Sequence, residues 1–165
     1  DVLLAALAAL TDLDWQAGLA GRSHDSETAT ELQALRDAFG LAGRVRIAGE
    51  VPDDELARLY GAASIFALAT RYEGYGIVFG EAMRSGLPIV SCHVGAVPET
   101  VPKEAGLLVP PDDPPAFAAA LRLLLENGPL RHDMAGAAHC HGAALTGWDE
   151  TARIVAGVVA QRDIS

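Results

Sequence analysis

The regular alternation of short apolar runs with longer helical patterns is the feature that most restricts the fold of this chain. Runs of strand length occupy residues 15–20, 45–48, 64–69, 88–92 and 107–109. Helical patterns occupy residues 2–10, 26–39, 52–60 and 77–84, and helical patterns follow again after residue 113. Strands that alternate with helices are typical of βαβ units, in which successive strands are parallel. The sequence therefore predicts an α/β fold, with a parallel sheet flanked by helices.

The length of the chain, 165 residues, suits one ordinary domain with a sizeable core. We expect residues 1–165 to form a single domain, because no linker or repeat interrupts the pattern. The chain begins at Asp1 inside a helical pattern, and we interpret it as a fragment of a longer protein. The amphipathic segment after Trp148 is expected to pack on a surface, either of this chain or of a second copy through self-association.

The segment Glu73–Glu81 joins two carboxylates to a glycine-rich turn, between the predicted strand 64–69 and the predicted helix 77–84. Gly74 and Gly76 give the backbone the freedom to turn before the helix begins. The turn is therefore expected at the carboxyl end of a strand, the edge of an α/β sheet where ligands bind. Free N–H groups at a helix N-terminus attract phosphate, so the segment suits a sugar joined to a phosphate.

The formal net charge of −10 argues against binding to nucleic acid or to an anionic membrane, because either needs a broad basic face. An anionic ligand must then be held by a local site. Cys92 and Cys140 are far apart in the sequence and match no Cys-x-x-Cys pattern, so we expect reduced thiols and a cytoplasmic protein. Peripheral association of the full-length protein with a membrane stays open from the sequence.

Several short motifs follow one another in an order that resembles a known enzyme family. Two glutamates, Glu73 and Glu81, enclose a glycine-aromatic-glycine turn, and seven residues lie between them. The matching segments are 73–81, 81–83, 86–88, 95–99 and 106–110. Together they resemble the donor-binding core of nucleotide-sugar glycosyltransferases of the GT-B fold, in particular the retaining family 4. The resemblance implies that the chain is the C-terminal one of two Rossmann-like domains.

The resemblance also implies roles for residues of the turn. Glu81 would bind the ribose hydroxyls of the donor, and Glu73 would be the catalytic carboxylate near the reacting carbon of the sugar. Gly74 and Tyr75 would belong to the donor-binding turn. Such roles agree with the chemistry, because a carboxylate accepts paired hydroxyl donors and stabilises an oxocarbenium-like transition state.

Further donor contacts are implied along the backbone. The N–H groups around Gly76, Ile77 and Val78 would meet the sugar and the diphosphate. The backbone near Val51 would contact the base, and Gly21 would let the loop after the first strand approach the ligand. Arg71 is a further candidate for a phosphate or an acceptor, weighed equally against an exposed arginine that serves solubility.

The family implies a nucleotide-diphosphate sugar as substrate, no cofactor and no metal. Its diphosphate-binding Arg and Lys, and its acceptor domain, would lie before Asp1, so the isolated fragment is expected to be inactive. The His139-Cys140-His141 run resembles a metal motif, but these neighbours face different sides of a helix and no carboxylate cluster accompanies them. Asp12 and Asp14 are better interpreted as turn residues.

Two other functions remain open from the sequence. The chain could be a sugar-nucleotide-binding module without transferase activity, or it could belong to another GT-B enzyme, such as a nucleotide-sugar epimerase or a phosphorylase. A nicotinamide-binding site is a poor alternative, because Gly74, Gly76 and Gly80 come in the middle of the chain rather than after its first strand.

Overall fold

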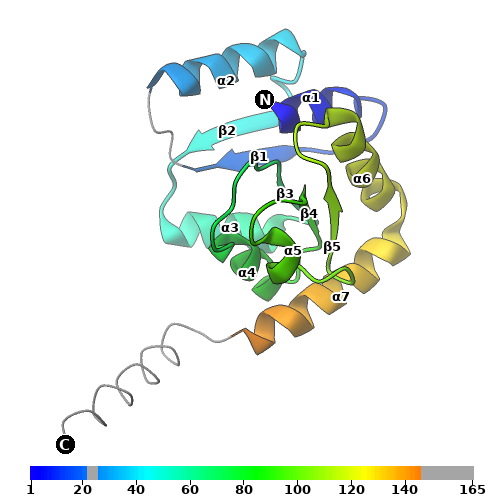
Figure 1. The fold of residues 1–165 in the computed structure, drawn as a ribbon. Helices are drawn as coiled ribbons and strands as arrows, with labels where there is room; N and C mark the ends of the chain where they lie inside the picture. Colours follow the sequence, from blue (N-terminus) through cyan, green and yellow to red (C-terminus); the bar gives the residue numbers. More distant parts are fainter. Residues whose placement is uncertain (22–25, 146–165) are drawn as a thin grey trace, which may run out of the picture.

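The computed structural model describes residues 1–21 and 26–145. Helices and strands alternate along the chain (Figure 1). The helices are α1 (Val2–Ala8), α2 (Ser26–Ala38), α3 (Asp53–Ala62), α4 (Ile77–Arg84), α5 (Val97–Thr100), α6 (Pro114–Glu126) and α7 (Gly128–Ala144). The strands are β1 (Ala17–Ala20), β2 (Val45–Gly49), β3 (Phe66–Leu68), β4 (Ile89–Cys92) and β5 (Gly106–Val109).

All the strand pairs are parallel, which confirms the predicted α/β fold. The structure adds that the strands hydrogen bond in two ladders. One ladder contains β1 and β2, and the other has the order β3-β4-β5. In Figure 1 the first ladder lies above the second, and its strands run in a different direction. The carboxyl ends of strands from both ladders carry the loops that the sequence assigns to the donor.

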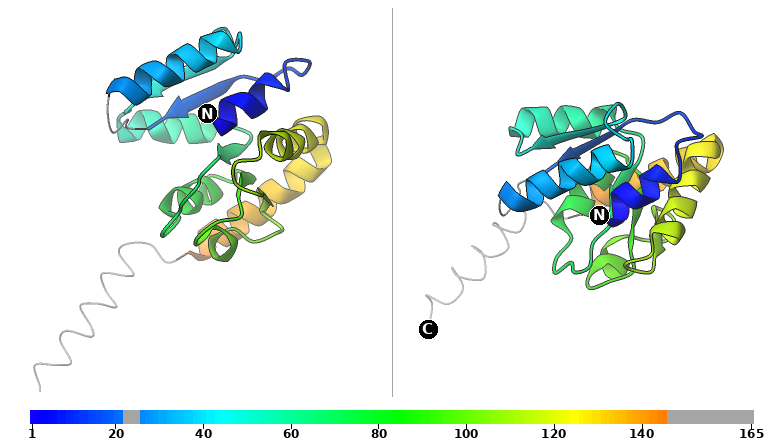
Figure 2. Two further views of the ribbon diagram at one scale, coloured as in Figure 1. Left: turned by 45° about the horizontal axis from the view of Figure 1, so that its top comes forward. Right: turned by 90° about the horizontal axis from the view of Figure 1, so that it is seen from above.

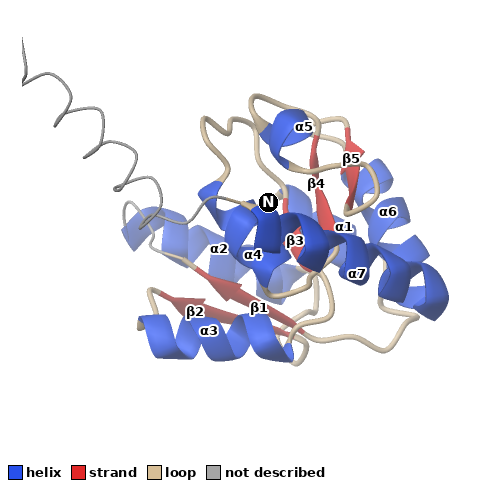
Figure 3. Ribbon diagram, turned by 90° about the horizontal axis from the view of Figure 1, so that it is seen from below, coloured by secondary structure: helices blue, strands red, loops and turns tan. Residues whose placement is uncertain are grey.

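The helices cover both ladders. The α2 and α3 helices lie on opposite sides of the β1–β2 pair (Figures 1 and 3). The α1 helix packs against α6, and α4 packs against α7 (Figure 2). Each of these helices places an apolar face toward a sheet or a neighbouring helix, which is the arrangement that the alternating pattern predicts.

The first strand begins later than the sequence predicts, at Ala17 rather than Trp15. Trp15 is buried, and its indole N–H donates a hydrogen bond to the Leu10 carbonyl over 2.7 Å. The Arg44 guanidinium lies 5.1 Å from the centre of the indole ring and also donates to the Leu13 carbonyl. Trp15 therefore closes the connection between α1 and β1 instead of pairing in the sheet.

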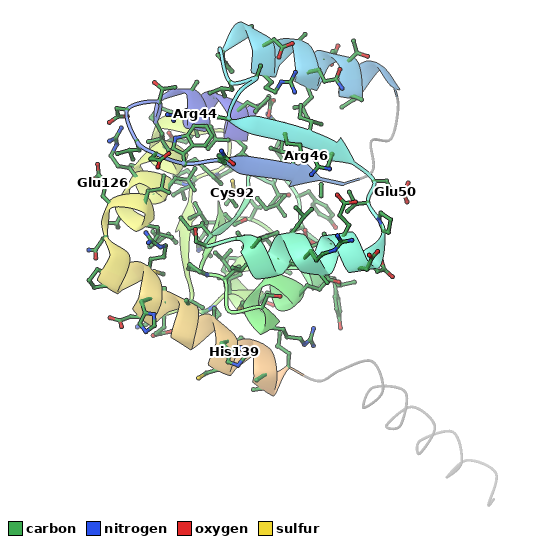
Figure 4. All side chains as sticks on the ribbon, turned by 180° about the vertical axis from the view of Figure 1, so that it is seen from behind. Arg44, Arg46, Glu50, Cys92, Glu126 and His139 are labelled. Atoms are coloured by element: carbon green, nitrogen blue, oxygen red, sulfur yellow. The ribbon has the colours of Figure 1, made fainter. Side chains whose placement is uncertain are left out.

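The core is densest around the middle strand β4, where Ile89–Cys92 are all buried. Ser91 is the buried polar residue of this strand, and its hydroxyl donates to the Leu68 carbonyl over 2.8 Å. Burial raises the pKa of the Cys92 thiol, whose side chain lies in the interior (Figure 4). Strand β4 thus anchors the edge on which the loop after β3 rests.

Close contact between α7 and α4 depends on a glycine. A Cβ atom added to Gly142 would overlap the backbone of Met83 and Arg84 at the end of α4. We predict that Gly142→Ala lowers the free energy of unfolding by about 2 kcal/mol, because an added methyl group overpacks a contact between two backbones. Chemical denaturation would measure this loss.

The same helix supplies a matched control for that prediction. Gly136 is exposed, and an added Cβ would meet nothing within 4 Å. Gly136→Ala should therefore raise the stability by about 0.5–1 kcal/mol, since alanine loses less conformational entropy than glycine in a helix. If Gly142→Ala raised the stability as Gly136→Ala should, or left it unchanged, the proposed contact would be contradicted.

The amphipathic segment after Trp148 lies outside the described residues, so its predicted packing and self-association stay predictions. In the part of the chain that the structure describes, none of the helices combines the length and the apolar character that crossing a membrane requires.

Candidate functional site

The residues assigned to the donor lie beyond the carboxyl ends of three strands, and a further motif of the resemblance follows a fourth. Gly21 follows β1, Val51 follows β2 and Glu73 follows β3, while the 95–99 motif follows β4. The Gly21 N–H donates to the Gly49 carbonyl over 2.8 Å, which joins the first two of these loops. Parallel strands place their carboxyl ends at one edge of a sheet, and the structure gathers the predicted loops at such edges in both ladders.

Glu73 folds back on its own turn, directly before helix α4. Its Oε1 atom accepts hydrogen bonds from the Gly76 N–H over 2.9 Å and from the Tyr75 N–H over 3.3 Å. Gly76 is the N-cap of α4 and has a φ of 76°, a left-handed conformation that glycine adopts without strain. The carboxylate is half-buried, and its Oε2 atom takes no part in these bonds.

The hydrogen bonds of Glu73 show which backbone N–H groups of the turn are already paired. The Gly76 N–H, which the sequence assigned to the ligand, already donates to Glu73 in this structure. No acceptor is recorded for the Ile77 and Val78 N–H groups within the described residues. Those two groups are the free donors of the α4 N-terminus, and the positive end of the helix dipole adds to their attraction for an anion.

The loop after β4 fixes the backbone of Glu73. The Ala96 N–H donates to the Glu73 carbonyl over 3.0 Å, and Gly95 has a φ of 50°. A Cβ atom on Gly95 would overlap the Glu73 carbonyl oxygen. Thr100 packs on the other side of the turn, since a Cβ on Gly76 would lie 3.1 Å from its Oγ1 atom. The two glycine-containing motifs therefore form one structural unit.

Glu81 points toward helix α3. Its Oε2 atom accepts a hydrogen bond from the Tyr60 hydroxyl over 3.2 Å, and both side chains are half-buried. The sequence predicted a helix that contains Tyr60 and gave this residue no role in the site. Its role could have been suspected, since Tyr60 occupies an apolar position of the helix and a buried phenol hydroxyl needs a polar partner.

Burial, the nearby charge of Glu81 and the hydrogen bond to it together raise the pKa of Tyr60 to about 12. The ordinary pKa of tyrosine is 10.0, so the stability that the protonated phenol contributes is complete below about pH 10 and is lost as the pH rises toward 12. We predict that the absorbance titration of tyrosinate contains a component near pH 12 that Tyr60→Phe removes. A Tyr60→Phe variant that keeps this component would contradict the assignment.

Arg71 is held by two carboxylates. Its Nε atom donates to Asp112 over 2.6 Å, and its Nη2 atom donates to Asp1 over 2.7 Å. All three side chains are more than half exposed, and surface ion pairs of this kind contribute little stability. A phosphate at Arg71 would have to compete with both carboxylates, so its predicted contact with a donor or an acceptor stays a prediction.

The turn also presents apolar surface. Tyr72 is 82% exposed, Tyr75 is 76% exposed and Ile77 is 47% exposed. Tyr75 is a predicted donor contact, and its ring is open to solvent at the start of α4. The backbone of this turn, rather than its aromatic side chains, is what the surrounding loops hold in place.

Asp12 and His139, which the sequence offered as weaker site candidates, each lie next to an arginine. Arg122 donates to both carboxylate oxygens of Asp12, which lowers the pKa of that carboxyl, and Asp12 lies in a turn as expected. His139 Nδ1 lies 3.2 Å from the Arg84 carbonyl at the end of α4 (Figure 4). Within residues 1–21 and 26–145, no three His, Cys, Asp or Glu side chains are grouped so that they could hold a metal ion.

Comparison with known protein families gives a match over residues 1–127, to a family described as "Glycosyl transferases group 1". D-inositol 3-phosphate glycosyltransferase from Corynebacterium diphtheriae is 36% identical over 152 residues, which cover 88% of this chain and 36% of that enzyme. The protein of the same name from a Nocardioides species is 37% identical over 129 residues, covering 78% of this chain and 28% of that protein. The chain thus spans about a third of the length of these relatives.

Solved structures show the same fold. Sucrose-phosphate synthase from Thermosynechococcus elongatus superposes with a TM-score of 0.87 at 30% identity, covering 97% of this chain and 41% of that one. The C-terminal domain of LpcC from Francisella tularensis gives a TM-score of 0.74 at 26% identity, covering 85% of this chain and 74% of that one. HepE from Anabaena, solved with UDP, is 24% identical with a TM-score of 0.83, covering 97% of this chain and 44% of HepE.

Proposed function

This chain belongs to the group 1 glycosyl transferases, and from that membership we propose that it binds a nucleoside-diphosphate sugar as the donor for sugar transfer. Its fold is that of the C-terminal half of a GT-B glycosyltransferase. The proposed reaction is retaining transfer of the sugar to an acceptor.

One observation carries the proposal: helix α4 brings three suitable groups together. Glu73 lies just before the helix and accepts from the N–H of its N-cap residue Gly76, the free N–H groups of Ile77 and Val78 lie at its first turn, and Glu81 lies one turn further along. The free N–H groups suit a diphosphate, which carries the negative charge that a helix N-terminus attracts. Glu81 suits a ribose, whose neighbouring hydroxyls both donate to one carboxylate.

Glu73 suits the reacting sugar. Its Oε1 atom is engaged by two backbone N–H groups, and its Oε2 atom is left for a ligand. The bonds from Tyr75 and Gly76 hold the carboxylate, and the bond from Ala96 holds the Glu73 backbone, before any ligand arrives. A fixed negative charge stabilises the positive charge that develops on a sugar ring as the bond to the leaving diphosphate breaks, and prior fixation avoids reorganisation during the reaction.

The rest of the site is proposed to lie outside this chain, which covers 36% of the Corynebacterium diphtheriae relative. We propose that a second domain supplies the acceptor site and the positive charge opposite the diphosphate, and that the isolated chain is inactive. The relatives' names make D-inositol 3-phosphate the first acceptor to test with the whole protein. We place that protein in the cytoplasm.

Calorimetric titration with UDP, GDP, ADP and their sugar conjugates tests the proposal. UDP comes first, because HepE holds it in the same fold. We expect one of these nucleoside diphosphates to bind, and we expect its sugar conjugate to compete with it for the same site. Absence of binding to all of them, both by this chain and by the whole protein, would contradict the proposal. Binding without sugar transfer by the whole protein would favour a non-catalytic module, and isomerisation of the donor alone would favour an epimerase.

A further inference from the structure

Building on the proposed donor site, we propose that Tyr60 is a positioning residue that fixes the Glu81 carboxylate for the ribose of the donor. The Tyr60 hydroxyl donates to Glu81 Oε2 over 3.2 Å. Within residues 1–21 and 26–145, this is the only hydrogen bond that the structure shows for the Glu81 side chain. Glu81 therefore keeps its Oε1 atom for a ligand while its other oxygen is held.

The Tyr60 ring is itself held in place. Its centre lies 6.0 Å from the centre of the Phe66 ring on β3, at an interplanar angle of 36°. Phe66 in turn meets Phe79 edge to face, with ring centres 5.9 Å apart. Phe79 is fully buried and belongs to α4, two residues before Glu81. The hydroxyl and its acceptor are thus fixed to the same aromatic cluster.

Because of the position of Tyr60 in the fold, its hydrogen bond to Glu81 also connects elements of the two strand ladders. Helix α3 follows β2 and belongs to the first ladder, whereas α4 follows β3 in the second ladder (Figure 1). The loops near Gly21 and Val51 lie at the end of the first ladder, and Glu81 lies beside the second. A nucleotide that reaches both parts needs them in a fixed relation, and the bond from Tyr60 to Glu81 joins them beside the proposed ribose site.

Loss of the Tyr60 hydroxyl should weaken the contact between Glu81 and the ribose without weakening the other contacts of the ligand. A free glutamate side chain populates several rotamers, so binding would have to order it at an entropic cost. In Tyr60→Phe we expect the affinity for a nucleoside diphosphate to fall about five- to tenfold, while its 2′,3′-dideoxy counterpart changes less than twofold. The dideoxy ligand makes no ribose contact with Glu81, so it does not depend on the carboxylate position.

Calorimetry on the 165-residue chain would test this with UDP, GDP and ADP and their 2′,3′-dideoxy counterparts. Tyr60→Phe keeps the ring that packs on Phe66 and removes only the hydroxyl. Glu104→Ala is the control, because it removes a polar group from a side chain that is 60% exposed and lies outside the proposed site. A general structural role for Tyr60 would weaken both ligand series equally, and that result, like an unchanged affinity, would overturn the proposal.

A crystal structure of the unliganded Tyr60→Phe variant gives an answer that does not depend on nucleotide binding. We expect the Glu81 carboxylate to leave its wild-type position or to occupy more than one. A single, unmoved carboxylate would overturn the positioning role even if nucleotides bind. If neither the wild-type chain nor the whole protein binds a nucleotide, the proposed function fails, whereas the displaced carboxylate still supports Tyr60 as the residue that orients Glu81.

Discussion

Glu81→Ala is expected to lower the affinity for the donor nucleotide about 100-fold, because it removes the proposed acceptor of both ribose hydroxyls. A hydrogen bond to a charged group contributes about 1.5 kcal/mol or more, so two such bonds amount to about 3 kcal/mol, or roughly a factor of 100 in affinity. Calorimetry with the nucleotide that binds the wild-type chain would measure the loss. The fold should survive, since the Tyr60 ring stays packed on Phe66 and its half-buried hydroxyl can bond to water.

Glu104→Ala is the matched control for this experiment. Glu104 is 60% exposed and has a long contact of 3.8 Å with Lys103, so its removal should leave both the affinity and the stability unchanged. The 2′,3′-dideoxy nucleotide provides a second control, since its affinity should be similar for the wild-type chain and for Glu81→Ala. A loss of less than about threefold in Glu81→Ala would remove Glu81 from the proposed ribose site.

Gly95→Ala is expected to destabilise the protein by about 3 kcal/mol and to weaken nucleotide binding at the same time. The left-handed backbone of Gly95, with a φ of 50°, costs a residue with a side chain about 1 kcal/mol, and overlap of the new Cβ with the Glu73 carbonyl adds about 2 kcal/mol. Relief of the overlap would move Glu73 and break its bond from Ala96. Urea denaturation and calorimetry would measure the two effects.

Substitutions at two other glycines separate the cost of the left-handed backbone from the cost of the overlap with Glu73. Gly40 has a φ of 69° but open space around an added Cβ, so Gly40→Ala should show only the backbone cost of about 1 kcal/mol. Gly43 has open space and no left-handed backbone, so Gly43→Ala should be nearly neutral. If Gly95→Ala costs no more than Gly40→Ala, the close approach to Glu73 does not constrain the turn.

The secondary structure could be predicted almost entirely from local pattern. The helix expected at 77–84 is α4, Ile77–Arg84, because glycines end the turn before it and an apolar face runs through it. The strand expected from Trp15 was two residues too long at its start, since the sequence does not show that the Trp15 indole pairs with the Leu10 carbonyl. Tertiary contacts decide such boundaries.

The candidate site was predictable in part. Glu73 and Gly76 lie three residues apart, so the hydrogen bond between them is local, and the sequence placed both in the turn before α4. The sequence did not predict that the Glu73 side chain bonds the backbone of its own turn, because it proposed only a ligand for this carboxylate. In the structure one oxygen of Glu73 accepts from Tyr75 and Gly76, and the proposed sugar contact stays a prediction.

The sequence by itself determined the order of strands and helices, the parallel α/β class and the turn that carries Glu73, because periodicity and glycine placement act over a few neighbouring residues. Only the tertiary structure decided that Gly95 supports Glu73 and that Tyr60 meets Glu81. These partners are 22 and 21 positions apart, and their contacts depend on how loops and helices pack across the sheet edge. Packing of that kind is set by the shapes of many side chains together, which no local pattern encodes.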